Sequence, residues 1–410
     1  MGIIALIFAP TYTHIGSGIA WWVDMAARAV RGRSLSFALL GVGAALALAG
    51  CAGDADDTGT GNPATDGDNE VKVDTRSPAA RRQYDANVAF ANAYAAKCAN
   101  PSSGRPRVLV TGFGRFMSIE NNATGRIVST MVPAVRYPET SAPPAGEVDR
   151  PDTQLSVALS TLDLPSVGKV DVCAMILPVY WDLAAILIAK EMNAFEPNMV
   201  LMNGVAGDRQ PIWIELGAVN KAAKLDDGSN QLRPAASDNE PFAKLVESAG
   251  RDEDARPNLL SWRAVEGAAR AAAERHANDV DQGTRFGDVL SGARLAGFPR
   301  SSNTYLCNNV TYTTGYLMAH PRRQIRLLRA SPALPGKINE VRVELKKDLT
   351  KVPRVFVHWP SELATKHHAA GADVMRTVIE AQLAALKRGD IPTNGDNALA
   401  DPSLQGGGFF

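Results

Sequence analysis

Cys307, His358 and Glu215 are the three side chains whose types and positions in the sequence predict covalent chemistry. Cys307 precedes a polar stretch that predicts a helix, so its thiol is expected at a helix N-terminus, where the helix dipole favours the thiolate. His358 ends the apolar run 354–358, and Glu215 ends the run that begins at Ile212. A histidine can activate a thiol and a carboxylate can orient the histidine, so the three residues predict a cysteine hydrolase if the fold brings them together.

Each of these residues also has an ordinary structural interpretation. A cysteine at a strand end can be a buried core residue or half of a disulfide, a histidine can be a hydrogen-bonded core group, and a single glutamate can lie at the surface. Other histidines are weaker candidates, because His276 and His320 fall in helical stretches and the pair His367 and His368 follows a loop. The choice depends on what the fold places around Cys307.

Apolar runs typical of buried strands recur along the chain and alternate with helical patterns. The sequence predicts strands at 107–111, 171–177, 199–203, 212–216 and 354–358, and helices that begin after Ser77, near Tyr180, at Trp262 and at Ala372. This alternation predicts an α/β fold of three layers, α/β/α, in which a largely parallel twisted sheet is covered by helices on both faces. Functional sites in such sheets gather at the carboxyl ends of the strands, where we expect Cys307, His358 and Glu215.

The N-terminal part of the chain predicts export. Residues 36–50 are apolar and small, follow several arginines and lead into the stretch LAGC, which ends at Cys51 and resembles the lipobox of bacterial lipoproteins. The resemblance implies a signal peptide over 1–51, with 1–24 an over-extended start, and a lipid on Cys51 that anchors the protein to a bacterial membrane, facing the periplasm or the cell exterior. A plain signal peptide that is cleaved elsewhere is the alternative.

Composition divides the rest of the chain into a tether, one domain and a tail. Residues 52–76 and 389–410 contain too few large apolar side chains to offset the entropy cost of ordering, so we expect both to be disordered. The α/β domain is expected to span 77–388. The chain has 43 Lys and Arg against 43 Asp and Glu, and this balance gives no reason to expect a nucleic acid as partner.

Four cysteines occur in the chain. With Cys51 lipidated, three remain in an oxidising compartment, so at least one thiol stays free. We pair Cys98 with Cys173 and leave Cys307 free, although Cys173 lies inside an apolar run and is equally compatible with a buried core residue. No cluster of His and Cys has the spacing of a metal site, and we expect neither a metal nor another cofactor.

Four separated stretches form a further pattern: VLVTGFGRF at 108–116, the segment from Ile176 that reads ILPVYW and later NGVAGDRQPIWIELGAVN, SNTYLCNNVTY at 302–312, and RVFVHWP at 354–360. Together they resemble the pyroglutamyl peptidase I (pyrrolidone-carboxylate peptidase) family of cysteine peptidases, which remove an N-terminal pyroglutamate. The match spans roughly residues 107–387 and keeps that family's order of Glu, Cys and His. The resemblance implies that Cys307 is the nucleophile, His358 the general base and then acid, and Glu215 the carboxylate that orients His358.

The same resemblance implies a substrate site. Phe113 and Phe116 would hold the flat lactam ring between apolar faces, and Asn122 would form a hydrogen bond with the lactam amide. Arg115 stands where the family has proline, which places a charge near the expected mouth of the pocket. The implied protein is an exported, divergent family member that hydrolyses the amide bond after an N-terminal pyroglutamyl (5-oxoproline) residue of a peptide. The alternatives are an amidase for another lactam-like or cell-wall substrate and a non-catalytic binding lipoprotein.

Overall fold

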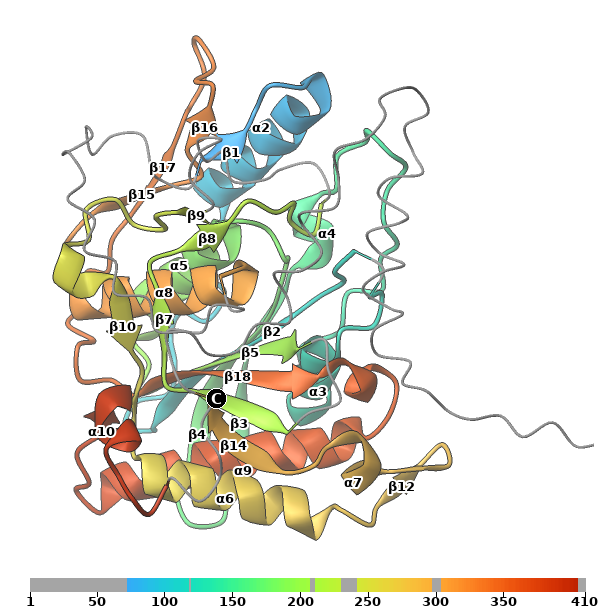
Figure 1. Cartoon of the computed structure of the whole chain (residues 1–410), viewed down its shortest axis with the longest axis vertical. Helices are drawn as coiled ribbons and strands as arrows, with labels where there is room; N and C mark the ends of the chain where they lie inside the picture. Colours follow the sequence, from blue (N-terminus) through green and yellow to red (C-terminus); the bar gives the residue numbers. More distant parts are fainter. Residues whose placement is uncertain (1–71, 118, 207–210, 230–241, 297–303, 405–410) are drawn as a thin grey trace, which may run out of the picture. The chain divides into compact units, whose positions relative to one another are not determined.

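A mostly parallel β-sheet forms the centre of the chain (Figure 1). The computed structural model describes residues 72–117, 119–206, 211–229, 242–296 and 304–404. The strands of the main sheet are β2 (Arg107–Phe113), β3 (Ser156–Leu164), β4 (Gly168–Leu177), β5 (Met199–Ala206), β6 (Ile212–Glu215), β14 (Ala293–Ala296) and β18 (Arg354–Pro360). They lie in the order β14-β6-β18-β5-β2-β4-β3.

The strands β18, β5, β2 and β4 are parallel to one another, whereas β6 is antiparallel to β18 and β3 is antiparallel to β4. At one edge, β14 is parallel to β6. The predicted strands are all present, and the predicted α/β fold with a largely parallel sheet is confirmed. The one consequential difference is the reversed direction of β6, because β6 carries Glu215.

Helices cover both faces of this sheet and give three layers (Figure 1). One face is covered by α2 (Pro78–Ala93), α5 (Leu183–Phe195) and α8 (Leu306–Ala319), and the other by α3 (Ala123–Met131), α6 (Trp262–Arg275) and α9 (His368–Lys387). Alternate residues of β18 belong to different cores: Phe356 packs in the core that contains α8, whereas Val355 and Val357 pack in the core that contains α9. This follows from the two-residue period of a strand that is buried on both faces.

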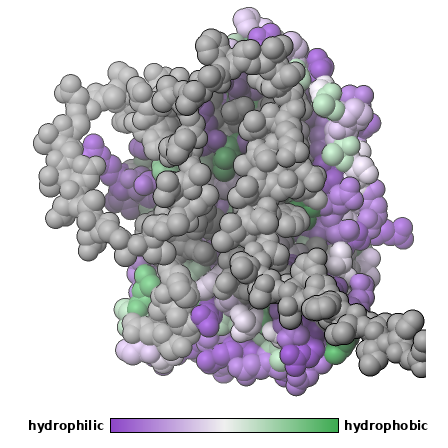
Figure 2. Space-filling model, turned by 45° about the vertical axis from the view of Figure 1, so that its right-hand side comes forward, coloured by the Kyte–Doolittle hydropathy of each residue, from purple (hydrophilic) through white to green (hydrophobic). Residues whose placement is uncertain are grey.

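Short elements connect the three layers. They are α4 (Pro151–Gln154), α7 (Phe286–Val289), β7 (Gly217–Val219), β8 (Ala222–Ala223), β9 (Phe242–Ala243), β10 (Ala255–Pro257), β12 (Val280–Asp281), β13 (Thr284–Arg285), β15 (Ile325–Leu327), β17 (Val341–Val343) and the 3₁₀ turns η1 (Arg251–Glu253) and η2 (Ser361–Ala364). On the face drawn in Figure 2, hydrophilic residues predominate among the coloured atoms, and hydrophobic residues form only small separate areas.

A disulfide joins Cys98 to Cys173, which confirms the predicted pairing and leaves Cys307 free. The bond ties the segment after α2 to the buried strand β4, with the two Cα atoms 5.6 Å apart. Glu191 of α5 lies beside it and accepts hydrogen bonds from the backbone N–H groups of Lys97 at 2.7 Å and Cys98 at 2.9 Å. Because the two sulfur atoms are bonded to each other, this group of cysteines and glutamate offers no thiolate to a metal ion.

Two stretches that composition predicts to be disordered are in fact ordered in part. β1 (Val73–Asp74) pairs with β16 (Ala330–Ser331), and β19 (Thr393–Asn394) pairs with β11 (Leu259–Leu260) before α10 (Gly395–Leu399). At Gly395 an added Cβ atom would lie 2.0 Å from the carbonyl oxygen of Leu216, so the tail packs directly against the chain after β6. The expected disorder is therefore wrong for 72–76 and 389–404, because backbone pairing and close packing do not require large apolar side chains.

The predicted signal peptide over 1–51, its Cys51 and most of the predicted tether lie outside the described residues. Within the described ranges, none of the helices combines the length and the apolar character needed to cross a bilayer.

Candidate active site

His358 is held inside β18 and does not end that strand. The strand continues through Trp359 to Pro360, and β18 stays in register with β5 as far as the pair of Pro360 and Ala206. The expectation that His358 lies at a strand end is therefore wrong. Its side chain points to the face covered by α8, next to Phe356, with ring centroids 4.8 Å apart.

Glu215 reaches His358 across an antiparallel pair of strands. Trp213 of β6 lies opposite His358, so Glu215 lies on the same face and diagonal to His358, within reach of a long side chain. Its Oε1 atom is 2.7 Å from Nδ1 of His358. The sequence predicts that the two residues meet because the carboxyl ends of parallel strands lie together. They meet instead because β6 pairs antiparallel with β18.

Cys307 approaches His358 from the layer above the sheet. It lies in the first turn of α8, after Tyr305 at the N-cap, and its side chain is half-buried. In the sheet below, Gly204 of β5 is the register partner of His358. A Cβ atom at Gly204 would lie 2.8 Å from Sγ of Cys307, so the thiol rests directly on the backbone beside His358 and leaves room only for glycine there.

The charges of the three side chains favour a protonated His358. Burial by itself lowers the pKa of this imidazole, but the neighbouring side chains of Cys307 and Glu215 favour its charged form and raise the pKa to about 10. At neutral pH the ring is therefore an imidazolium that donates Nδ1–H to Glu215. This imidazolium lies beside the sulfur of Cys307, where it can donate a proton in a reaction at that sulfur.

Polar side chains that the sequence reasoning missed hold α8 in position. The amide of Asn308 bonds to both backbone groups of Val219 in β7, at 2.9 and 2.8 Å. Asn309 donates to the buried Asp182 at 2.8 Å, and Asp182 also accepts the backbone N–H of Leu328 at 2.8 Å. Burial raises the pKa of Asp182 to about 6, while these hydrogen bonds act in the other direction. The signal in the sequence is the pair of asparagines directly after Cys307.

The predicted substrate residues lie around the same end of the sheet. Phe113 ends β2 and is 2% exposed within the core that contains α8. Phe116 is half-buried and packs its ring against Tyr305, with centroids 5.9 Å apart. The ring of Tyr305 also contacts Trp181 edge-on at 5.5 Å. Tyr305, two residues before Cys307 in the chain, therefore joins Phe116 and Trp181 in an aromatic cluster.

Asn122 has a structural role that the sequence reasoning did not foresee. It is the N-cap of α3, and its Oδ1 atom accepts hydrogen bonds from the backbone N–H of Thr124 at 3.1 Å and from the hydroxyl of Thr124 at 2.7 Å. Its Nδ2 group donates no hydrogen bond to another residue that the structure describes. Only this N–H₂ group is left to bind a substrate, and it would donate to a carbonyl oxygen.

Arg115 is not a charge at a pocket mouth. Its side chain is buried and forms an ion pair with Asp149, with Nη2 and Oδ2 2.5 Å apart. Asp149 is held in turn by Gln83 of α2, which bonds to both of its backbone groups at 2.8 Å. Arg115, which stands where the family pattern has proline, therefore connects the loop after β2 to α2 through Asp149 and Gln83.

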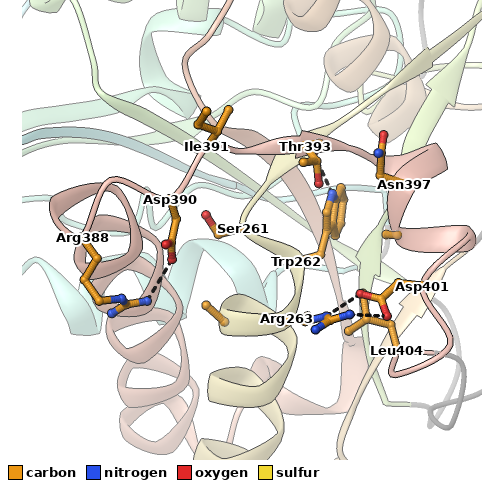
Figure 3. A pocket seen from close by; sticks show the side chains of 12 residues that line it. Ser261, Trp262, Arg263, Arg388, Asp390, Ile391, Thr393, Asn397, Asp401 and Leu404 are labelled. Carbon is orange, nitrogen blue, oxygen red and sulfur yellow. Dashed lines mark hydrogen bonds and ion pairs between the residues drawn. The ribbon is translucent and has the colours of Figure 1, made fainter.

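A separate hollow of about 390 Å³ lies near the C-terminal end of the described chain and contains none of the predicted site residues (Figure 3). It is bordered by the start of α6, the end of α9 and α10. Its charged side chains are already paired, since Arg263 bonds to Asp401 at 2.6 Å and Arg388 bonds to Asp390 at 3.1 Å. Trp262 donates to the carbonyl of Thr393 at 2.8 Å. The hollow offers no group arranged for chemistry.

These contacts define a class: an α/β protein whose Cys307, His358 and Glu215 have the arrangement of a cysteine hydrolase. No protein-family model and no curated protein matches the sequence. Among solved structures, the chain resembles pyroglutamyl peptidase I of Bacillus amyloliquefaciens, with 12% identity, a TM-score of 0.41 and coverage of 68% of this chain and 98% of that one. It also resembles pyrrolidone carboxyl peptidase of Pyrococcus furiosus, with 19% identity, a TM-score of 0.40 and coverage of 68% and 99%.

These structural neighbours are of the family that the four sequence stretches resemble. At such identities and TM-scores, what those proteins act on says nothing about the substrate of this chain. The chemistry of this chain therefore depends on the geometry of its own residues.

We expect the imidazole of His358 to titrate with a midpoint near pH 10, because the Cys307 and Glu215 side chains stabilise its charged form. Glu215→Gln and Cys307→Ala should each lower that midpoint towards about 6.5. The measurement is the pH dependence of the ring ¹³C and ¹H shifts in protein labelled at histidine. The surface residue His276 provides an internal control that neither substitution should move, and a midpoint for His358 that is unchanged in both variants would contradict the arrangement.

Proposed function

We propose that this protein is a cysteine peptidase that removes an N-terminal pyroglutamyl residue from peptides. The observation that carries the proposal is the hydrogen bond between Glu215 and His358, which lies beside the free thiol of Cys307. His358 and Glu215 are 7% and 1% exposed. A buried and oriented imidazole next to a half-exposed thiol is the arrangement that nucleophilic catalysis by cysteine requires.

The reaction follows from the charges. The thiolate of Cys307 attacks the carbonyl carbon of the pyroglutamyl residue and forms a tetrahedral oxyanion. His358 then gives its proton to the leaving amine, and a thioester remains on Cys307. The neutral imidazole next takes a proton from water, which attacks the thioester, releases pyroglutamic acid and restores the thiolate of Cys307 beside the protonated His358. Glu215 keeps the ring in one orientation throughout.

The first turn of α8 supports the oxyanion part of this proposal. The N–H groups in the first turn of a helix have no partner inside the helix, and the side chain of Tyr305 makes no capping hydrogen bond to them. The N–H group of Cys307 is one of these. Donors that are fixed before the reaction stabilise a developing negative charge without the cost of reorienting.

A pyroglutamyl ring suits the aromatic and amide groups near the thiol. The ring is flat, small and uncharged, so recognition depends on shape and on a few hydrogen bonds to its amide. Phe116 offers an apolar face beside Tyr305. The free Nδ2 group of Asn122 supports a hydrogen bond to the lactam carbonyl, while its Oδ1 atom stays bonded to Thr124.

We expect the domain from residue 72 to release a fluorescent amine from a pyroglutamyl amide, because the thiolate attacks the lactam-bearing carbonyl. Cys307→Ala should reduce kcat by at least roughly 10⁴-fold, as removal of a nucleophile does in other hydrolases. The measurement is kcat and KM under mild reductant, with a glutaminyl amide as the open-chain comparison.

Glu215→Gln should also lower kcat, and the matched control is Glu266→Gln, which changes a buried glutamate of α6. Turnover of the glutaminyl amide equal to that of the pyroglutamyl amide would exclude the lactam as the recognised group. Absence of turnover, together with labelling of Cys307 by iodoacetamide no faster than that of a simple thiol, would exclude the enzyme and leave the non-catalytic binding protein.

Asn122→Asp separates the two roles of Asn122. Aspartate keeps the oxygen that caps α3, so the melting temperature should stay unchanged, whereas it has no N–H group to donate to a lactam carbonyl. We expect kcat/KM for the pyroglutamyl amide to fall by at least roughly 10-fold. Asn122→Ser, which also keeps a capping oxygen and loses the amide, should give the same result, and full activity in both variants would show that Asn122 only caps the helix.

We further propose that the protein is exported and anchored by a lipid on Cys51. The disulfide between Cys98 and Cys173 supports export, because such bonds persist in oxidising compartments. When the full chain is produced in a bacterial host, mass spectrometry should find a mature N-terminus at Cys51 with the added mass of a lipid. Cys51→Ser should instead leave the chain unlipidated and the membrane fraction depleted of it, and a mature chain that begins elsewhere would contradict the proposal.

A further inference from the structure

A second group of charged residues lies under α8, at the end of β18 opposite to the active site. Arg354 is the first residue of β18 and is 6% exposed. Its Nε and Nη1 atoms are buried and donate no hydrogen bond, and within the described ranges no carboxylate forms an ion pair with its guanidinium. An unpaired charge in a protein interior is unfavourable, so this arginine requires an explanation.

The nearest charged neighbour of Arg354 makes its position less favourable. Arg256 of β10 repels it, and the Nε atom of Arg256 is likewise buried without a partner among the described residues. The two side chains meet at Gly315 of α8, where an added Cβ atom would lie 3.4 Å from Cδ of Arg256 and 3.5 Å from Nε of Arg354. Three buried N–H donors from two guanidinium groups therefore lie close to one point on α8.

Glu253 neutralises only part of this charge. It forms an ion pair with Arg256, with Nη2 and Oε1 2.5 Å apart, and it also bonds to His320 at 2.8 Å. Glu253 thus pairs with Arg256, and no carboxylate among the described residues pairs with Arg354. Burial and the charge of Arg256 lower the pKa of Arg354 to about 10, which still leaves the guanidinium protonated at neutral pH.

We propose that a small monovalent anion of the halide class, chloride in solution, binds between Arg354 and Arg256. One negative charge neutralises the charge of Arg354, and the buried Nε and Nη1 groups supply the hydrogen bonds that the anion needs. Gly315 adds no side chain at the place where the two arginines meet, and a monovalent ion costs less to dehydrate than a divalent oxyanion. The geometry thus assigns a structural anion site to the contact of β18, β10 and α8.

This site differs from the active site in place and in role. Arg354 and His358 are on the same face of β18 and four residues apart, a separation of about 13 Å. The bound anion therefore does not touch the reacting atoms. It stabilises the strand that carries His358 beneath the helix that carries Cys307.

The experiment compares potassium chloride with potassium gluconate at equal ionic strength, on the domain from residue 72. We expect the melting temperature to be higher in chloride by a few degrees, on the order of 2–4 °C at 0.5 M, and bromide to act as chloride does. Arg354→Met should remove this difference. Arg388→Met, which changes an exposed arginine paired with Asp390, is the matched control and should keep it.

Equal melting temperatures in chloride and gluconate would overturn the proposal, and so would the same chloride effect in Arg354→Met. If Arg354→Met does not fold, crystals of the unaltered domain soaked in potassium bromide decide the question. A peak of anomalous scattering between the guanidinium groups of Arg354 and Arg256 supports the site. If bromide fully occupies other positions in the crystal and no peak appears between these groups, the site is excluded.

Discussion

The candidate active site depends on one pair of antiparallel strands within a sheet that is otherwise largely parallel. Because β6 runs opposite to β18, Glu215 becomes a diagonal neighbour of His358 and its carboxylate reaches the imidazole at 2.7 Å. If β6 were parallel to β18, this register would not place Glu215 diagonal to His358. The direction of a four-residue strand thus determines whether the imidazole is oriented and charged.

The position of the thiol depends on polar contacts that lie outside the triad. The amides of Asn308 and Asn309 connect the first turn of α8 to β7 and to the buried Asp182. Below them, Gly204 allows the sulfur of Cys307 to rest on the backbone of β5. Nucleophilic catalysis of the proposed kind depends on placement within about 1 Å, so for that proposal these contacts matter as much as the identities of Cys307, His358 and Glu215.

The buried charged side chains near these elements differ in whether another residue of the chain pairs with them. Arg115 and Asp149 form an ion pair, and Gln83 connects this pair in the loop after β2 to α2. Arg354 has no such partner among the described residues, although it is on the same strand as His358. A buried charge that is paired within the chain needs no ligand, whereas one that is not paired points to an ion from solution.

The sequence by itself determined the three layers, the strands of the parallel sheet and the identity of the reactive side chains, because long apolar runs and helical periods are local properties. It also indicated which cysteines pair. It did not determine the direction of β6, the interior position of His358 in β18, the capping role of Asn122 or the burial of Arg115 with Asp149, and it wrongly predicted disorder for 389–404. All of these depend on contacts between residues far apart in the chain, and only the tertiary structure decides such contacts.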